Sequence, residues 1–434
     1  MMQEPTYAGC LDDPTDTPAG QPINPPFPET PEQLDLSLGF VTDLALKTLS
    51  TDASGTTASV SERMRLGLVI TETVLQRLYR ESLIEMKGSI ALHNNRYAML
   101  ERGWSRVSQL MSIGSYVGPA PVTLELYSKL IVDQVRRRAP VTREALDKTL
   151  SHLVLPEAVT RMLGVVVSSG RSLFLSGPPG NGKTAMARAL VNAVAAPLWI
   201  PYAIEVDGQV IRVFDKHVQQ AVEHEEPDFD RRWVKIRPPL VVVGGELTIE
   251  SLDLTATESP RYYEAPFQLK ANGGVLLVDD FGRQRCSARQ LLNRWIIPLE
   301  NRVDSLTLST GKKIDIPFEQ IIVFATNLAD ADLVDEAFMR RMGYRLAVFR
   351  PSTETYAEIF RRAAAEFGLT VDEKSIDGLL QRYKTEGRQP NACEPRDLIL
   401  RAADLCRFEQ QELTLTDQNL ALAWEGYFGV PARE

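Results

Sequence analysis

The feature that most constrains the fold of this chain is a glycine-rich octapeptide set between an apolar segment and a run of helix formers. It consists of Gly177, Pro178, Pro179, Gly180, Asn181, Gly182, Lys183 and Thr184. The pattern at 172–176 predicts a short buried strand, and residues 185–195 favour a helix. The glycines let backbone N–H groups turn inward around an anion, and the helix adds its positive N-terminal end. A tight turn alone would explain neither the Lys-Thr pair nor the flanking elements. The octapeptide therefore predicts a phosphate-binding loop.

The last two residues of this loop indicate which phosphate compound it binds. We expect the Lys183 ammonium to reach the β- and γ-phosphates of a nucleotide. We expect the Thr184 hydroxyl to hold Mg²⁺, which prefers oxygen ligands. All eight residues of the loop are therefore candidate nucleotide-binding residues, with ATP and Mg²⁺ as the expected ligands.

A second motif, at 273–280, has the chemistry needed to hold a metal ion and activate water. Its four apolar residues, 275–278, predict a buried parallel strand that ends in Asp279 and Asp280. Ligands of open α/β sheets bind at the carboxyl ends of the strands. We expect Asp279 to hold Mg²⁺ through water and Asp280 to be the base that orients or polarises the attacking water. The alternative is a strand that ends in a solvated acidic turn, which its place about a hundred residues after a phosphate loop disfavours.

With these two motifs the chain resembles the AAA+ ATPases, from about Leu155 to the C-terminus. A second apolar strand is predicted at 320–326, and Asn327 follows it. Asn327 matches the first sensor of that family, a polar side chain that contacts the γ-phosphate or the attacking water. The resemblance implies that the chain hydrolyses ATP.

Two arginine-bearing segments extend the resemblance in the order that the family has them. Residues 335–342 resemble the segment that carries the arginine finger. We favour Arg341 as the finger, with Arg340 as its alternative or as a partner contact; a solvated helix end is the other interpretation. Residues 394–397 are expected to open a helix in the small C-terminal domain. They are similar to the second sensor of the family, with Arg396 as the residue that contacts phosphate.

The arginine finger implies an assembly, because an arginine at the far end of a subunit cannot easily reach the phosphates bound by that same subunit. It would act on the ATP of a neighbouring subunit. The resemblance therefore implies a homo-oligomer, most often a hexameric ring in this family, with ATP sites shared between subunits.

One position departs from the family pattern. Most AAA+ members have glutamate where Asp280 stands, and aspartate is one methylene shorter. Water would then be held less well and hydrolysis would be slow, or Asp280 would do the work with an adjusted backbone. The sequence leaves both readings open.

Two further segments predict β-hairpins. Residues 301–316 alternate around a glycine, and a hairpin before the first sensor resembles the branch of the family that includes MoxR-type chaperones and bacterial enhancer-binding activators. A second hairpin is expected at 204–214, followed by a charged cluster at 228–233. The arginines and Trp233 of this cluster would line a pore or pack on a neighbouring subunit, and we favour the subunit contact.

Together the motifs predict an α/β fold, with a P-loop parallel αβα AAA+ core, a small C-terminal helical lid and an N-terminal winged-helix-like domain. The expected divisions are a flexible proline-rich tail (1–32), the winged-helix-like domain (33–115), a helical linker (116–154), the nucleotide-binding domain (155–350) and the lid (351–434). The winged helix is inferred from predicted helices at 36–49, 59–66 and 69–81 followed by extended pieces at 84–87 and 96–99.

The third of these helices would be the DNA reader of a winged helix. Its polar positions are Thr71, Glu72, Thr73, Gln76, Arg77 and Arg80. Between residues 36 and 110, however, nine basic and seven acidic side chains leave a surplus of only two positive charges. Because DNA affinity depends largely on phosphate neutralisation, a nearly neutral module favours docking of a protein partner.

The composition of the chain limits which partners and which cellular location we expect. A net charge of −9 argues against non-specific nucleic-acid binding by the whole chain. The N-terminus lacks the apolar core of a signal peptide and no apolar run approaches membrane-spanning length, so we expect a cytoplasmic protein without membrane insertion. We expect an oligomeric, chaperone-like ATPase that remodels or assembles an unknown protein client. The alternatives are a DNA-bound regulator or nucleic-acid-handling ATPase, and a slow nucleotide-dependent switch or scaffold.

Overall fold

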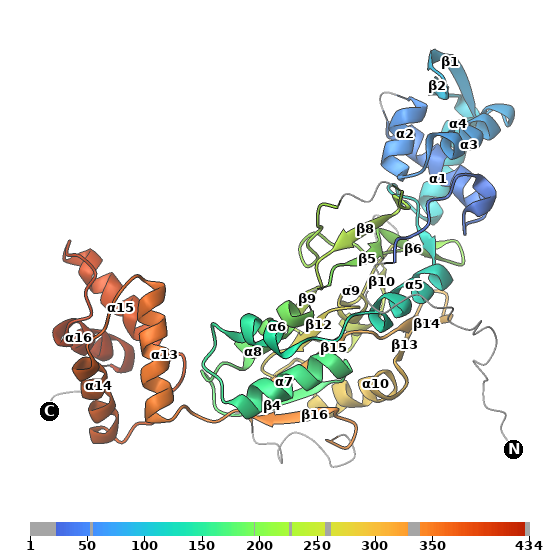
Figure 1. The fold of residues 1–434 in the computed structure, drawn as a ribbon. Coiled ribbons are helices and arrows are strands. Elements are labelled where there is room, and N and C mark those ends of the chain that lie inside the picture. The colour runs from blue at the N-terminus through green and yellow to red at the C-terminus, as the bar shows by residue number, and fades with distance from the viewer. Residues whose placement is uncertain are drawn as a thin grey trace, which may run out of the picture.

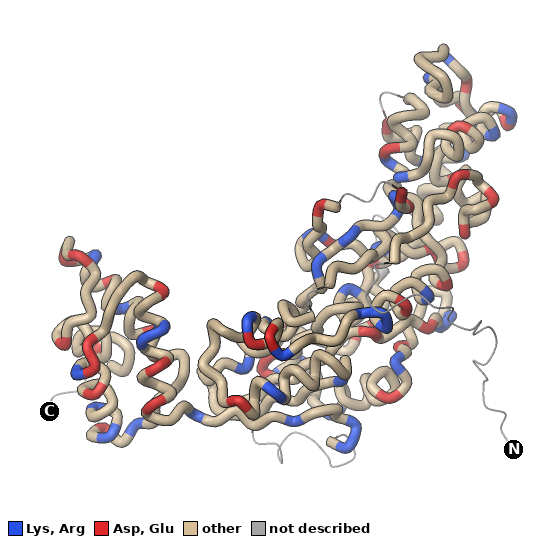
Figure 2. Tube along the Cα trace, viewed as in Figure 1, with Lys and Arg blue, Asp and Glu red and all other residues tan. Residues whose placement is uncertain are grey.

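A computed structural model of the chain describes residues 23–52, 55–194, 196–224, 228–256, 262–328 and 339–429. Figure 1 shows these residues as three lobes in a row. An N-terminal lobe of helices and a hairpin lies at one end, a sheet flanked by helices lies in the middle, and a C-terminal group of four helices lies at the other end. Acidic and basic residues are interspersed over all three lobes (Figure 2).

The central lobe is built on a five-stranded parallel sheet with the order β16-β4-β15-β12-β9. The strands are β4 (Leu173–Ser176), β9 (Leu240–Val243), β12 (Val275–Val278), β15 (Ile321–Thr326) and β16 (Tyr344–Ala347). Every residue of β12 and β15 is buried, which explains why these strands are continuous apolar runs in the sequence. The parallel sheet predicted for the nucleotide-binding domain is confirmed.

Helices cover both faces of this sheet, because successive side chains of a strand point to opposite sides. Leu173 and Leu175 of β4 pack in one cluster with α6 (Arg143–Leu150), α7 (Glu157–Ser169) and α8 (Lys183–Val194). Phe174, between them, packs in a second cluster with α10 (Ala288–Asn301) on the opposite face. The result is the predicted αβα layering, with α8 beginning at Lys183 directly after the glycine-rich loop.

The two predicted hairpins of the central lobe are also present. Strands β13 (Val303–Thr307) and β14 (Lys313–Pro317) pair antiparallel, as do β6 (Ala203–Val206) and β7 (Gln209–Arg212). The second hairpin belongs to a sheet with the order β10-β11-β7-β6-β3, whose other strands are β3 (Val122–Thr123), β10 (Thr255–Ala256) and β11 (Tyr263–Glu264). The remaining elements of this lobe are β5 (Leu198–Pro201) paired with β8 (Trp233–Ile236), α5 (Leu124–Arg136), α9 (Phe267–Lys270) and the short helix η2 (Glu250–Leu252).

The N-terminal lobe has three helices near the three predicted ones, and its two predicted extended pieces are the strands of a hairpin. They are α1 (Leu38–Ser50), α2 (Thr57–Met64), α3 (Leu68–Arg80), β1 (Ile84–Ala91) and β2 (Asn94–Met99), preceded by η1 (Pro31–Gln33) and followed by α4 (Glu101–Ile113). Residues 1–22 of the predicted tail lie outside the described residues, and the last ten residues of that tail include the buried prolines Pro25 and Pro28.

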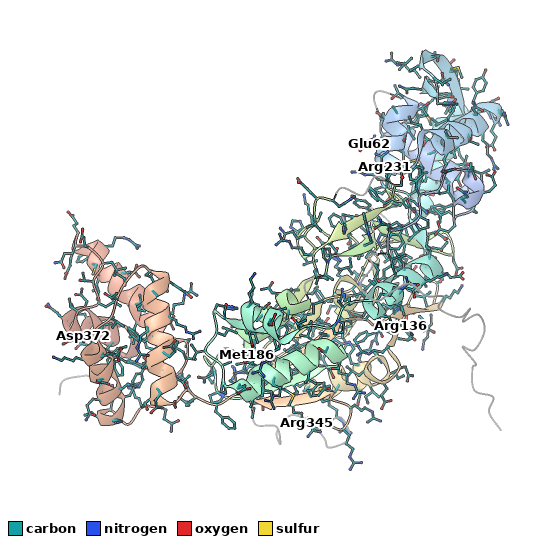
Figure 3. All side chains as sticks on the ribbon, viewed as in Figure 1. Glu62, Arg136, Met186, Arg231, Arg345 and Asp372 are labelled. Carbon is teal, nitrogen blue, oxygen red and sulfur yellow. The ribbon has the colours of Figure 1, made fainter. Side chains whose placement is uncertain are left out.

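Two interpretations of surface residues are wrong. Thr71 and Glu72 of α3, expected among the polar contact positions, are buried at 1% and 4% exposure, because they face the core of their own lobe. Arg232 and Trp233 neither line a pore nor contact a neighbour, because both are buried within the chain at 2% exposure. Beside them, Arg231 pairs with Glu62 at the boundary between the N-terminal and central lobes (Figure 3).

The C-terminal lobe consists of α13 (Thr353–Glu366), α14 (Glu373–Thr385), α15 (Glu394–Phe408) and α16 (Asp417–Phe428) around a hydrophobic core of their own. This is the predicted helical C-terminal region. No helix among the described residues is both long and apolar enough to cross a membrane.

Candidate nucleotide-binding site

The glycine-rich loop joins the carboxyl end of β4 to the first residue of α8, with Met186 one turn into that helix (Figure 3). Gly177, Gly180 and Gly182 all have positive φ angles, of 142°, 74° and 85°. A Cβ atom at Gly177 would lie 2.0 Å from the carbonyl oxygen of Val348, so only glycine fits there. The local backbone thus meets the geometric requirement of a loop that turns its N–H groups toward an anion at a helix N-terminus.

Lys183 lies between this loop and the end of β15. Its Nζ donates hydrogen bonds to the carbonyl oxygens of Gly177 (2.7 Å) and Pro178 (2.9 Å) and to Oδ1 of Asn327 (2.5 Å). Burial lowers the pKa of Lys183, and the carboxylates of Asp279 and Asp280 partly offset this effect. The loop and the first sensor position predicted from the sequence are therefore in direct contact.

Thr184 and Asp279 form an oxygen pair suited to a hard cation. The Thr184 hydroxyl donates to Oδ2 of Asp279 at 2.9 Å. Within the described ranges no cluster of three His, Cys, Asp or Glu residues could hold a metal ion. A hydroxyl and one carboxylate fit Mg²⁺, because this ion usually takes few protein ligands and completes its shell with phosphate oxygens and water.

Asp280 is held by a side-chain amide beside Asp279. Its φ angle is +47°, in the left-handed region that aspartate and asparagine tolerate better than most residues. Asn327 donates from Nδ2 to Oδ1 of Asp280 at 3.0 Å while its Oδ1 accepts from Lys183. Gln284, which the sequence did not single out, donates to the carbonyl oxygens of Asp279 (2.9 Å) and Asp280 (3.2 Å). One continuous chain of hydrogen bonds therefore links Lys183, Asn327 and Asp280.

The predicted arginines lie away from this chain of contacts. Arg341 pairs with Glu300 at the end of α10, and it stands three residues before β16. The backbone of Gly343 donates to Ser172 at the amino end of β4 (3.1 Å), whereas Val348 donates to Ser176 at the carboxyl end (2.7 Å). Arg340 and Arg341 are thus at the opposite edge of the sheet from the glycine-rich loop; residues 335–338 of that segment lie outside the described residues.

Arg396 lies in the first turn of α15, on a helix whose start touches the loop. The backbone N–H of Cys393, the residue before α15, donates to the carbonyl oxygen of Gly180 at 2.9 Å. The Arg396 side chain is exposed, with no hydrogen bond or ion pair to any described residue. Asn391, which the sequence did not indicate, also contacts the loop. Its only sequence signal is a polar residue three positions before a glutamate at a helix start, a pattern that predicts a cap and not a loop contact.

In comparisons with known protein families, the central and C-terminal parts of the chain match two different families. Residues 173–350 match the family described as ATPase family associated with various cellular activities (AAA). Residues 352–426 match a domain of unknown function, DUF8689. No curated protein matches the chain.

The similar solved structures share little of their sequence with this chain. The RuvB Holliday junction branch migration motor of Thermotoga maritima is 15% identical, with 66% of this chain and 70% of that chain covered and a TM-score of 0.36. NtrX of Brucella abortus in complex with ADP is 16% identical, with 74% and 65% covered and a TM-score of 0.39. The similarity to the AAA family therefore rests on the sequence match over residues 173–350 and on the parallel αβα fold of that part of the chain.

Proposed function

We propose that this protein binds ATP with Mg²⁺, hydrolyses it in a site shared between subunits of an oligomer, and uses the cycle to remodel or assemble a protein partner. The observation that carries the proposal is the hydrogen-bonded chain from Lys183 through Asn327 to Asp280. It joins a phosphate-binding group, a sensor position and a base in one site.

Each residue of the site has a role that follows from its chemistry. The loop amides and the Lys183 ammonium bind the β- and γ-phosphates and stabilise the negative charge of the transferring group. Thr184 and Asp279 would hold Mg²⁺, which would neutralise phosphate charge when bound. The Asp280 carboxylate orients the attacking water, and Asn327 keeps that carboxylate in place.

The backbone conformation of Asp280 is relevant to the length of its side chain, which is one methylene shorter than the glutamate of most AAA+ members. Its left-handed φ and its hydrogen bond to Asn327 support the reading in which an adjusted backbone compensates for the shorter acid. Turnover in the range of family members would follow, whereas very slow turnover would favour a nucleotide-dependent switch.

The glycine-rich loop and the two arginines lie at opposite edges of the sheet. This placement supports an ATP site that is shared between subunits. The four residue-to-residue steps from Tyr344 to Val348 carry the chain from one edge of the sheet to the other, about 13 Å at the rise of a parallel strand. Arg341 at the amino edge therefore contacts the ATP of a neighbour, with Arg340 as the alternative finger. The hairpin β13–β14 just before β15 favours the branch that includes MoxR-type chaperones.

The N-terminal lobe, which we propose is winged-helix-like, serves to dock the protein partner. On α3 the buried Thr71 and Glu72 are not available for contacts, and Arg77 is paired with Glu81 at 2.9 Å. The same helix exposes Leu68, Val69 and Tyr79, side chains suited to a protein surface. If the protein instead binds DNA, duplex binding will appear at low salt and weaken steeply as salt rises.

Nucleotide binding by Lys183→Ala tests the loop assignment. We expect the affinity for a fluorescent ATP analogue with Mg²⁺ to fall at least tenfold, the loss expected for a charge-assisted contact to phosphate. Lys216→Ala is the matched control, because Lys216 is exposed and distant in sequence from the loop. Equal affinity of Lys183→Ala and wild type would remove the assigned loop.

Mixing two inactive variants tests the shared site. Lys183→Ala lacks the phosphate ligand and Arg341→Ala lacks the finger, so each is expected to be inactive alone. A mixed oligomer contains some interfaces with an intact loop opposite an intact finger, and we expect it to recover part of the wild-type turnover. No recovery, once co-assembly has been demonstrated by cross-linking, would count against a site completed by the neighbour.

A further inference from the structure

Three hydrogen bonds join the glycine-rich loop directly to the C-terminal lobe. Asn181 donates from Nδ2 to Oδ1 of Asn391 (3.3 Å), and its own Oδ1 accepts from the backbone N–H of Ala392 (3.1 Å). The backbone N–H of Cys393 donates to the carbonyl oxygen of Gly180 (2.9 Å). The start of α15 is thus docked on the loop by specific polar contacts.

On the loop side, the same amide that makes this contact also supports the loop. Asn181 is 4% exposed. Its Nδ2 lies within hydrogen-bond distance of the carbonyl oxygens of Pro178 (3.3 Å) and Pro179 (3.1 Å) as well as of Asn391. The shape of the loop and the position of α15 therefore depend on one side chain.

On the side of the C-terminal lobe, Asn391 is fixed by buried and charged partners. Its Nδ2 and backbone N–H donate to the two carboxylate oxygens of Glu394, at 2.8 Å and 2.7 Å. Glu394 is 3% exposed and also accepts from the hydroxyl of Tyr383 at 2.5 Å. Arg350, in the segment between β16 and α13, donates to Oδ1 of Asn391 at 3.0 Å. Asn391 therefore connects the loop, the helical lobe and the segment that joins the lobe to the sheet.

The element that these contacts hold is the first turn of α15, which begins at Glu394 and contains Arg396. We propose that Asn391 is a positioning residue for ATP turnover, which docks this turn on the glycine-rich loop and so sets the place of the Arg396 guanidinium relative to the bound triphosphate. The inference rests on the proposed function, and it takes Arg396, the residue similar to the second sensor, to contact the phosphates of the bound ATP. Asn391 itself acts through Arg396.

A simpler role for Asn391 is to stabilise the start of α15 through Glu394, with no effect on the nucleotide. The two roles differ in a double-mutant cycle of Asn391→Ala and Arg396→Ala, because residues that act as a unit give non-additive effects. We expect Asn391→Ala to lower kcat/KM for ATP about tenfold, the order of one or two hydrogen bonds. We expect the kcat/KM of the double variant to be no lower than that of Arg396→Ala alone.

The outcomes of this cycle decide between the roles. Losses that multiply in the double variant, or a kcat/KM of Asn391→Ala equal to that of wild type, would overturn the positioning role. Gln381→Ala, on the exposed surface of α14, is the matched control and is expected to leave kcat/KM unchanged. Thermal unfolding of each variant shows whether a lower kcat/KM arises only because a smaller fraction of the protein is folded.

A second readout does not depend on hydrolysis. Amide hydrogen exchange of the full chain without nucleotide reports the docking contacts, because the N–H groups of Ala392 and Cys393 both donate to the loop. We expect exchange at 391–397 to be faster in Asn391→Ala than in wild type; unchanged exchange would contradict docking by Asn391. If the wild-type protein neither binds nor hydrolyses ATP, the proposed function fails while this readout still tests the docking.

Discussion

At the scale of single residues, the candidate site depends on side chains that only the fold brings together. Lys183 follows β4, Asp280 follows β12 and Asn327 follows β15, and these strands are neighbours in the sheet order β4-β15-β12. The carboxyl ends of parallel strands meet at one edge, so residues up to 144 positions apart form hydrogen bonds there. Sheet order is therefore what assembles the site.

The left-handed backbone conformation of Asp280 predicts that two variants lacking the carboxylate differ in stability. Asparagine tolerates this conformation, whereas alanine is strained in it by about 1–2 kcal/mol. We expect Asp280→Ala to be less stable than Asp280→Asn by about 1 kcal/mol in urea unfolding, although both lose the carboxylate. Equal stability of the two variants would argue against the left-handed conformation at this position.

The residue types of the site could be predicted from the sequence, but several of their contacts could not. The loop, the two acids and Asn327 stand directly after apolar strands, and this local pattern places them at a strand end. The contacts of Asn391 and Gln284 have no such pattern, because they arise where separate segments meet. The burial of Thr71 and Glu72 was also missed, because a helix with polar residues on two faces does not reveal which face is covered.

At the scale of elements, a buried carboxylate joins α3 to the hairpin of the N-terminal lobe. Glu72 accepts hydrogen bonds from the hydroxyls of Thr57 (2.8 Å) and Tyr97 (3.0 Å) and from Nδ2 of Asn95 (2.8 Å). These contacts come from α2 and β2, so Glu72 fixes the hairpin against the helices. A fully partnered buried carboxylate of this kind makes the arrangement specific.

The hydroxyl of Tyr97 makes the stability of this lobe sensitive to alkaline pH. Burial, followed by the hydrogen bond to Glu72, raises the pKa of Tyr97 to about 12, above the value of about 10 for an unfolded tyrosine. A raised folded-state pKa contributes stability that is complete below pH 10 and is lost as the pH rises toward 12.

We therefore expect the urea midpoint of the wild-type protein to fall between pH 9 and pH 11.5 by more than that of Tyr97→Phe, which cannot ionise. Tyr79→Phe is the matched control, because Tyr79 lies half exposed on α3 of the same lobe, and it is expected to follow the wild type. An identical pH dependence for Tyr97→Phe and wild type would show that Tyr97 is not linked to folding.

The long elements were predictable and the short ones were not. Amphipathic helices and the two hairpins have clear periodicities in the sequence. The strands β3, β10 and β11 have only two residues each, too few for any alternation to be seen. In the folded chain β3 pairs with β6, β11 pairs with β7, and β10 pairs with β11. The second sheet and the place of the linker within it could therefore come only from the structure.

At the scale of the whole molecule, Arg232 connects three distant segments. It pairs with Asp230 (2.8 Å) and Asp35 (2.6 Å), and it donates to the carbonyl oxygen of Pro121 (3.0 Å). Asp35 belongs to the segment before α1 and Pro121 to the linker, so the contacts join the N-terminal lobe to the central lobe. This connection fixes the N-terminal lobe against the central lobe.

Removing Arg232 leaves the buried carboxylate of Asp230 without its cation. We expect Arg232→Ala to lose about 3–5 kcal/mol of stability, measured by urea unfolding, because breaking a buried pair leaves an uncompensated charge. Arg231→Ala, one residue away, removes only the largely exposed pair with Glu62 and is expected to change stability by less than about 1 kcal/mol. Similar losses for the two variants would contradict the role of Arg232 as the connecting residue.

Phosphate release from Asp280→Asn tests whether residues 173–350 hydrolyse ATP with Asp280 as the base. We measure steady-state release at saturating ATP and Mg²⁺, and nucleotide affinity on the same samples. The predicted result is a fall in turnover of about a hundredfold or more with binding retained, since general base catalysis contributes about 10²–10⁴ in rate. Turnover equal to that of the wild type would show that Asp280 is not the base.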